Sequence, residues 1–313
     1  MGPDTATPAT AALPVTHTSV VTKDQIDHLG HMNVIFYAVN AQAGTRAVLD
    51  RLDSWGGRPY VVHDVYTRHH HEQMLGTSLA VRSGVLGASP AALRLHHELV
   101  AVDSGDLAAT FVHAVSPVDD LGRRFPVPAE VVEATAIQAI DPPTYAATRT
   151  VSLDADLVGT APSLEELRER GLATRQERRI AADECDERGA YRLEKAPMLT
   201  WGGVAVEGDT GGQPRETSDG RLMAWASMET RLQCVALPAV GTRIQSFGAG
   251  VAIHDKVTHR VHWAYDLDTG GLLTVFEIVS LAFDIRGRRP MSIPDDVRAM
   301  EMAWLQPDLA PRP

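Results

Sequence analysis

The stretch Asp27-His28-Leu29-Gly30-His31-Met32-Asn33 separates two segments with different hydrophobic periods. Before it, His17–Val21 alternates polar and apolar residues, which is typical of a half-buried strand. After it, Val34–Leu52 carries its apolar residues at helical spacing, and Gly56-Gly57 ends that pattern. The sequence therefore predicts a strand, a tight polar turn and a long helix, in that order.

Four further strands are expected after the helix. Apolar runs alternate there with short breaks rich in Gly, Ser, Asp or Pro, and breaks of this length favour antiparallel hairpins. The runs are Pro59–Arg68, Thr77–Leu86, Ala91–Val102 and Asp106–Val118.

The second half repeats this order. The segment Asp-Gln-Ile-Asp-His-Leu-Gly, which begins at Asp24, has a counterpart Asp-Glu-Cys-Asp-Glu-Arg-Gly, which begins at Asp183. Both halves also close on an Arg-Arg pair followed by prolines, at 123–128 and 288–294. Matching ends in matching order indicate a duplication. The strands expected in the second copy are Leu222–Leu232, Thr242–Ile253, Lys256–Asp266 and Leu272–Asp284.

These patterns divide the chain into two domains and a connector. The connector contains an acidic helical segment, Ser163–Arg170, in which Ser163 and Glu166 have the spacing of a capping box. The expected boundaries are a flexible tail over 1–15, a first domain over 16–133, a connector over 134–172, a second domain over 173–303 and a tail over 304–313.

Composition narrows the class of protein. Among 313 residues, 40 acidic against 29 basic side chains give a net charge of −11, which disfavours binding to nucleic acid or to an anionic membrane. No run is long enough for a membrane helix, and Met1–Val15 lacks the basic start of a secretory signal, so a cytoplasmic protein is expected. Cys185 and Cys234 match neither a disulfide framework nor a zinc spacing.

The motif Asp27-x-x-Gly30-His31-Met32-Asn33, with Tyr37 four residues later, resembles the hotdog-fold acyl-CoA thioesterases of the 4-hydroxybenzoyl-CoA thioesterase-like branch. The resemblance covers about Thr16–Glu133 and implies an antiparallel sheet wrapped around a long central helix. The second domain matches in element order only. The fold expected is thus α+β, a tandem hotdog in which each domain has its own long helix.

Thioester hydrolysis needs a nucleophile or base near a polarised carbonyl. Asp27 matches the family's catalytic aspartate, His31 can donate to the carbonyl or orient water, and Asn33 can hold that water. Gly30 allows the tight turn, while the amides of His31, Met32 and Asn33 lie where a helix N-terminus stabilises an oxyanion.

Structural roles compete with these assignments. Asp27 could simply cap the helix, because Asp is a favoured capping residue. His31 and Asn33 could stabilise the turn, and Tyr37 could pack in the core rather than contact substrate.

The run His69-His70-His71-Glu72 offers a second carboxylate. Relatives carry an acidic residue near this point, so Glu72 is a candidate base or nucleophile beside Asp27. Strand alternation would place His70 and Glu72 on one face, which makes His70 a candidate substrate contact. The histidines also raise the alternative of a metal, but no complete ligand signature accompanies them, and none is expected.

The second domain departs from the motif, because Gly189 is followed by Ala190-Tyr191-Arg192. One working site is therefore expected, with first-domain residues doing the chemistry and Asp186 as a remnant. No cofactor is expected; CoA or phosphopantetheine belongs to the substrate, and an acyl carrier protein is a candidate partner. The sheet edges of a fused pair also allow a homodimer.

The sequence thus predicts hydrolysis of an acyl-CoA or acyl-carrier-protein thioester to free acid and thiol. Two alternatives stay open. One is a hotdog hydratase or dehydratase acting on an enoyl thioester, and the other is a protein that binds acyl thioesters without turnover.

Overall fold

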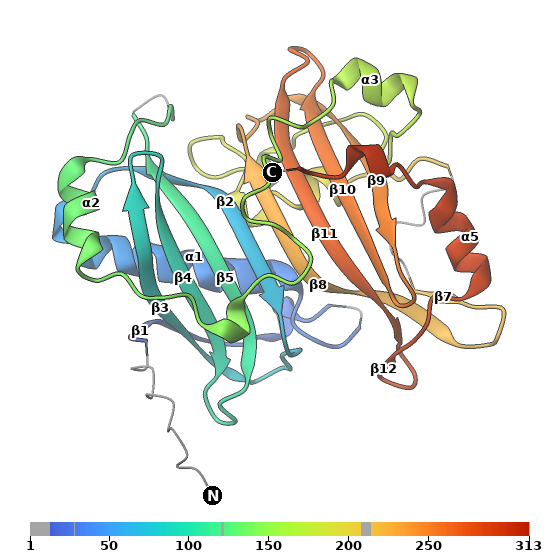
Figure 1. Cartoon of the computed structure of the whole chain (residues 1–313), viewed down its shortest axis with the longest axis horizontal. Helices are drawn as coiled ribbons and strands as arrows, with labels where there is room; N and C mark the ends of the chain where they lie inside the picture. The colour runs from blue at the N-terminus through green and yellow to red at the C-terminus, as the bar shows by residue number, and fades with distance from the viewer. Residues whose placement is uncertain (1–12, 28, 120–121, 208–213, 313) are drawn as a thin grey trace, which may run out of the picture.

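A single antiparallel sheet of twelve strands runs through the molecule, whose computed structural model describes residues 13–27, 29–119, 122–207 and 214–312 (Figure 1). Most of the expected 1–15 tail lies outside the described residues. The first strand begins at Val15, two residues before the predicted start.

The strands of the first half confirm the sequence prediction. Their order in the sheet is β1-β3-β4-β5-β2. All five lie within a few residues of the expected runs, and their bounds are β1 Val15–Val20, β2 Tyr60–His69, β3 Ser78–Ser89, β4 Ala92–Ala101 and β5 Leu107–Pro117.

The equivalent strands of the second half lie in the reverse order along the sheet, β8-β11-β10-β9-β6. Strands β2 and β8 pair antiparallel, from Asp64 opposite Gln233 to Arg68 opposite Glu229, and so join the halves. The four long predicted strands are confirmed. The bounds are β6 Arg178–Arg179, β7 Arg215–Glu216, β8 Leu222–Cys234, β9 Arg243–Ile253, β10 Val257–Asp266, β11 Leu272–Asp284 and β12 Arg289–Pro290.

Helix α1, Val34–Arg51, is the long helix predicted for the first half. Asn33 caps its first turn, because the Asn33 Oδ1 accepts the amide hydrogen of Ile35 at 3.0 Å. One stripe of the helix, which includes Tyr37, Ala41 and Leu49, is buried against the sheet. Gly44 allows the close approach: a Cβ there would lie 2.7 Å from the Val81 side chain.

Among the described residues of the second half there is no such helix, so the expectation of a long central helix in each domain is wrong for this half. The corresponding segment forms only η5, Leu193–Lys195, and α4, Met198–Trp201. Pro197 precedes α4, and Gly202 and Gly203 end it, with Gly203 at φ 89°. Proline lacks the amide hydrogen that a helix interior needs, and glycine disfavours helix, so the longer helix cannot propagate.

The remaining helices are short. The connector helix is confirmed as α3, and the Ser163 hydroxyl accepts the amide hydrogen of Glu166 at 3.1 Å. Helix α2 crosses the expected boundary at residue 133 and was not predicted. The bounds are α2 Ala129–Ala136, α3 Leu164–Glu169, α5 Asp295–Ala303, η1 Lys23–Gln25, η2 Asp53–Trp55, η3 Thr144–Ala146, η4 Ala182–Glu184 and η6 Pro307–Leu309.

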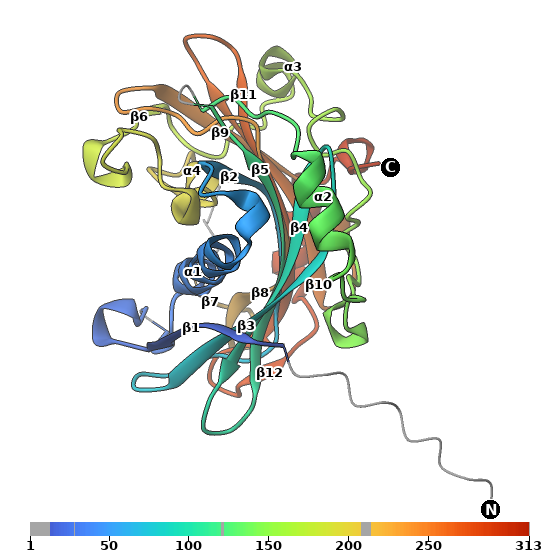
Figure 2. The same cartoon turned by 90° about the vertical axis from the view of Figure 1, so that its left-hand side faces the viewer.

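The sheet has two differently covered faces. Helices α1 and α4 lie on one side, here called the inner face, while α2 and α3 lie on the other, the outer face (Figure 2). The connector is bound along the β2–β8 seam: Arg231 pairs with Asp64 at 2.7 Å and donates to the carbonyls of Ser152 and Ala155. Buried Glu229 accepts the amide hydrogen of Thr150 at 2.8 Å. These bonds join the halves across the seam.

Within the part of the chain that the structure describes, no helix is long and apolar enough to cross a membrane.

Candidate active site

The turn between β1 and α1 is closed by its own backbone. The amide of Asp27 donates to the carbonyl of His31 at 2.9 Å, and the amide of Gly30 donates back to the carbonyl of Asp27 at 3.1 Å. Gly30 has φ 87°, a conformation that glycine adopts without a steric penalty. The amide of Met32 donates to the carbonyl of Gln73 at 2.7 Å. This last bond attaches the turn to the segment that follows β2, and so brings Glu72 to it.

Three of the predicted residues come together here. His31 lies between two carboxylates, with its Nδ1 3.5 Å from the Asp27 Oδ2 and its Nε2 3.7 Å from the Glu72 Oε1. The Asp27 and His31 side chains are 15% and 18% exposed, whereas that of Glu72 is 41% exposed. The Asp27 Oδ1 accepts the amide hydrogen of Leu29 at 2.8 Å, which leaves Oδ2 directed toward His31. The cluster thus has one protected carboxylate and one that solvent reaches.

A fourth residue of the cluster comes from the other half of the chain. Arg288, in the turn between β11 and β12, donates to the Glu72 Oε2. Its φ is 45°, and among the described residues it is the only non-glycine with a positive φ. In the sequence, Arg288 stands out only as part of a closing Arg-Arg pair. Nothing in the local sequence connects it to Glu72, because 216 residues separate them.

Asn33 and Tyr37 take structural positions next to the cluster. Asn33 is the N-cap of α1, so its side-chain oxygen is already bonded to the helix. Tyr37 is buried; its hydroxyl donates to the carbonyl of His71 at 3.2 Å, and its ring meets that of His69 edge-on at 5.4 Å. Burial raises the pKa of Tyr37 far above its ordinary value, so the phenol stays protonated. Met32 is likewise buried beneath the turn.

The three histidines that precede Glu72 do not follow simple alternation. Strand β2 ends at His69, and the amides of His70 and His71 both donate to the carbonyl of Ala108, at 2.9 and 3.2 Å. The His70 Nε2 lies 3.4 Å from the Thr110 hydroxyl, and the proximity of Arg68 helps to lower the pKa of His70. His70 therefore lies apart from the cluster of Asp27, His31 and Glu72.

Burial dominates the pKa of both His69 and His70 and lowers each to about 4, so both are neutral near pH 7. In the residues with a described placement, no three His, Cys, Asp or Glu side chains are grouped so that they could hold a metal ion.

The second half contains the same turn without the same side chains. The amide of Asp186 donates to the carbonyl of Ala190 at 2.8 Å, Gly189 has φ 78°, and the Asp186 Oδ1 accepts the amide hydrogen of Arg188 at 2.9 Å. Ala190 stands where the first turn has His31. The aspartate alone therefore accounts for the turn, and the histidine and second carboxylate distinguish the first half.

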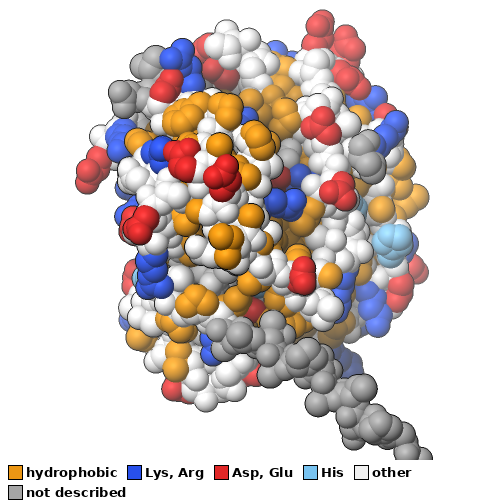
Figure 3. All heavy atoms as spheres, turned by 60° about the vertical axis from the view of Figure 1, so that its left-hand side comes forward, with side chains coloured by type: hydrophobic (Ala, Val, Ile, Leu, Met, Phe, Trp, Pro, Cys, Tyr) orange, Lys and Arg blue, Asp and Glu red, His pale blue; other side chains and the backbone are white. Residues whose placement is uncertain are grey.

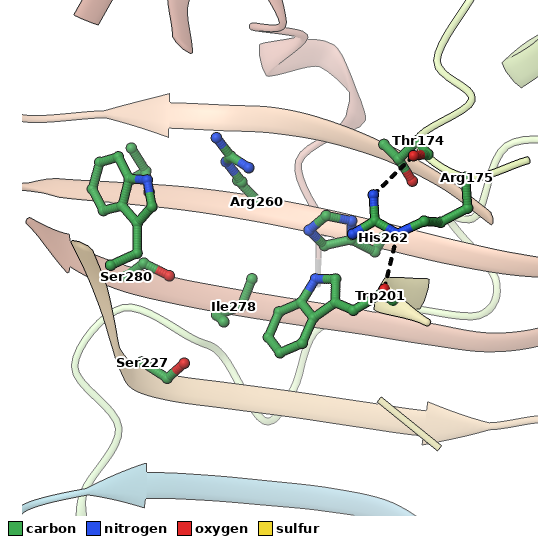
Figure 4. Close-up of a pocket in the computed structure, with 10 residues that line it drawn as sticks. Thr174, Arg175, Trp201, Ser227, Arg260, His262, Ile278 and Ser280 are labelled. Atoms are coloured by element: carbon green, nitrogen blue, oxygen red, sulfur yellow. Dashed lines mark hydrogen bonds between the residues drawn. The ribbon is translucent and has the colours of Figure 1, made fainter. Parts of the chain in front are cut away.

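A cavity of about 180 Å³ lies on the inner face of the second half, beside the β2–β8 seam (Figure 4). Arg260, His262, Ile278 and Ser280 reach it from β10 and β11. Trp201 of α4 covers it, with its ring 4.9 Å from Phe276 and edge-on. No local sequence pattern predicts this cavity, because its lining comes from strands β8, β10 and β11, from helix α4 and from the segment at 174–175.

Comparison with known proteins agrees with the site. Residues 20–135, which contain the turn, α1 and β2–β5, match the model of the thioesterase-like superfamily. This match supports thioester hydrolysis as the activity, and the matched region contains Asp27, His31 and Glu72.

Solved structures share the fold over most of the chain. An acyl-ACP thioesterase from Bacteroides thetaiotaomicron is 9% identical with a TM-score of 0.59, covering 84% of this chain and 96% of its own. The 12:0-ACP thioesterase from Umbellularia californica is 11% identical with a TM-score of 0.57, covering 88% and 93%. At these identities the likeness concerns the hotdog-type fold. No curated protein matches the chain.

Proposed function

We propose that the chain hydrolyses an acyl thioester at one site, built on the turn from Asp27 to Asn33 of the thioesterase-like first half. The observation that carries this proposal is the placement of His31 between the Asp27 and Glu72 carboxylates, at 3.5 and 3.7 Å, next to the N-terminus of α1. A structural turn requires only the aspartate and the glycine, as the second half demonstrates. The additional groups point to chemistry.

In the proposed reaction, a carboxylate removes a proton from water as the water oxygen bonds to the thioester carbonyl carbon. The carbon–sulfur bond then breaks, and the sulfur leaves with a proton as a thiol while the acyl group leaves as an acid. Asp27 is proposed as the base, because its Oδ2 is the more protected oxygen and faces His31. The positive end of the 18-residue α1 dipole lies where negative charge develops on the carbonyl oxygen.

Arg288 is proposed to hold Glu72 in place from the second half. Both side chains are well exposed, so their ion pair adds little to folding stability. A non-glycine residue at φ 45° costs free energy, and such strain tends to be retained where it positions a functional group. Glu72 and Arg288 would then orient His31, which in turn contacts the reacting groups.

The two halves are proposed to be two hotdog units of one tandem chain, with first and second units at about 16–133 and 173–303. The mirrored strand order about β2 and β8 supports this division, as do the two matching turns. In the second unit, short elements replace the central helix.

The carrier of the acyl group is proposed to be CoA or the phosphopantetheine of a carrier protein. On the face displayed in Figure 3, Lys and Arg side chains are scattered among Asp and Glu rather than gathered in one patch. This face does not favour either carrier, so both belong in the substrate panel.

The test is thiol release from acyl-CoA and acyl-carrier-protein substrates of short, long and aromatic acyl type. The wild type should release thiol, and His31→Gln and Glu72→Gln should each lower kcat/KM by about tenfold to a hundredfold with unchanged thermal stability. If neither substitution changed thiol release, the reaction would take place away from the turn at Asp27–Asn33. Enoyl-CoA consumed without thiol release would instead favour the hydratase alternative.

A further inference from the structure

The inner face of the second half is covered by short elements at the place where α1 covers the first half. The longest helix described between 173 and 303 is α5, with nine residues, and α4 has four. Trp201 of α4 packs on Phe276 and leaves the cavity open toward Ser227 and Ser280, which stand opposite each other on β8 and β11 (Figure 4). The loss of the central helix thus leaves space on the inner face.

The cavity lies next to the proposed catalytic cluster in the sheet, because β8, which lines it, pairs with β2, which leads to Glu72. The β2–β8 pairing runs to Arg68 opposite Glu229. Beyond that pair, the chain after β2 leads to Glu72, while β8 leads in the opposite chain direction to Ser227 and Trp225, both of which line the cavity. Arg288, at the end of β11, reaches Glu72 from the same end of the sheet. A thioester held at Asp27 can therefore extend its acyl group over the seam into this cavity.

The lining is unsuited to a plain alkyl chain. It contains two indoles, hydroxyl groups from four residues, the guanidinium groups of Arg175 and Arg260 and the imidazole of His262, whereas Ile278 is its sole aliphatic residue among those described. Covering a guanidinium and several hydroxyls with methylene groups would remove them from water without new partners, which is unfavourable. The volume, about 180 Å³, is also below the roughly 300–1,000 Å³ of pockets for drug-sized ligands.

Arg260 is positioned as an anion receptor. Glu301 of α5 accepts from both the Nε and the Nη2 of Arg260, which fixes the direction of the guanidinium plane. The Arg260 side chain remains 28% exposed, so Glu301 does not enclose it. A guanidinium prefers a carboxylate or phosphate as its ligand; since Glu301 occupies the Nε–Nη2 edge of Arg260, a second anion would bind at the Nη1 end.

We propose that this cavity is the acyl-recognition pocket and that it selects a compact acyl group ending in a carboxylate, which Arg260 binds. The inference rests on the proposed function for the thioester end of the substrate only. The binding of the carboxylate end is a separate property of the second half, and it can be measured without turnover.

The experiment compares glutaryl-CoA with pentanoyl-CoA, which has the same number of acyl carbons and no terminal carboxylate, and with decanoyl-CoA. Wild-type kcat/KM should be at least tenfold higher for glutaryl-CoA than for either of the others. The variant Arg260→Gln with Glu301→Gln should remove that preference, with a loss of at least tenfold on glutaryl-CoA and a smaller loss on pentanoyl-CoA. The paired substitution avoids leaving the largely buried Glu301 carboxylate without its cation. Arg170→Gln with Glu166→Gln, which removes an Arg–Glu ion pair at α3, is the charge-matched control and should keep the preference.

Two results would overturn the proposal. Equal or greater activity on decanoyl-CoA would show an alkyl pocket. Equal losses on glutaryl-CoA and pentanoyl-CoA in the paired variant would show that Arg260 binds a phosphate of CoA.

A calorimetric titration with free glutarate and free pentanoate separates this proposal from the proposed function. Wild-type protein should bind glutarate more tightly, and Ser227→Phe, which fills the cavity, should abolish the difference. If no thioester is hydrolysed and this binding persists, the catalytic assignment fails and the pocket stands. If turnover occurs without selective glutarate binding, the pocket assignment fails and the catalytic one stands.

Discussion

The turn at residues 24–33 and the turn at 183–192 have nearly the same backbone and different consequences. In each, a short 3-10 helix leads to an aspartate whose amide bonds four residues ahead, and a glycine with positive φ closes the turn. Only the first turn places a histidine between two carboxylates. The comparison teaches that the aspartate and glycine of the motif serve the backbone, whereas the positions after the glycine determine the chemistry.

The segments that follow the two turns differ more. Asn33 caps an 18-residue helix in the first half. In the second half, Pro197 and the Gly202-Gly203 pair limit the helix to four residues, and a polar cavity occupies part of the inner face. The largest buried cluster of the second half instead includes connector residues such as Leu157 and Leu167, on the outer face. The second half is thus packed on both faces, with short elements that include Tyr191, Ala196 and Leu199 on the inner face.

The largest effect is expected from substituting the two equivalent aspartates. Asp27→Asn should lower kcat/KM by about a thousandfold, because the amide still accepts the turn hydrogen bond but cannot act as a base. Asp186→Asn, the matched control, should stay within about twofold. Thiol release measures both. Loss of activity with Asp186→Asn alone would move the site to the second half.

A smaller effect is expected from the cross-half contact. Arg288→Ala should lower kcat/KM by about tenfold, because Glu72 loses the cation that holds it. Arg286→Ala, in the same turn, breaks the exposed pair with Glu216 and should leave activity unchanged.

Arg288→Gly separates the contact between Arg288 and Glu72 from the backbone strain at residue 288. It should lower activity as Arg288→Ala does, while its thermal stability equals or exceeds that of the alanine variant, because glycine relieves the strained φ. Full activity in the glycine variant would remove the positioning role of this arginine.

The buried polar network beneath α1 should make stability depend on pH. The Thr45 hydroxyl lies 2.8 Å from the His113 Nδ1 and 2.9 Å from the His97 Nε2, and burial lowers the pKa of His113 to about 3. As the pH falls below about 6.5, His113 becomes protonated in the unfolded chain but stays neutral in the folded chain. Stability should therefore be retained above pH 6.5 and be lost toward pH 3, by up to about 1.4 kcal/mol per pH unit from this histidine.

Urea unfolding at pH 7, 6 and 5 measures that slope. The variant His113→Asn should reduce it, whereas His254→Asn, at an exposed position of the second half, should not. An unchanged slope in the His113 variant would mean that other groups determine the acid sensitivity.

The smallest effect is expected from grafting the lost residues into the second turn. In the Asp27→Asn background, Ala190→His with Arg192→Asn should restore no thiol release, because the second turn has neither a long helix after it nor a counterpart of Glu72 brought to it. Restored turnover would show that the turn residues suffice without the helix.

Local sequence was enough to predict the elements that depend on short-range patterns. The strand runs, α1 and the capped α3 lie where periodicity, glycines and Ser163 indicated. Pro197 and Gly202-Gly203 also disfavour a long helix in the second half. The expectation of such a helix came instead from the repeated order of elements. His70 shows a different limit: the amides of His70 and His71 share the carbonyl of Ala108, so strand alternation is interrupted after β2 and no longer predicts the direction of His70.

The sequence by itself determined the likeness of residues 20–135 to the thioesterase-like superfamily, the duplicated strand order and the residues of the first turn, because these follow from hydrophobic period, turn chemistry and a contiguous motif. Tertiary structure alone decided that Arg288 meets Glu72 across 216 residues and that β8, β10, β11 and α4 enclose a polar cavity. Such contacts depend on strand register and on how the two halves join, and no local pattern of residues specifies either.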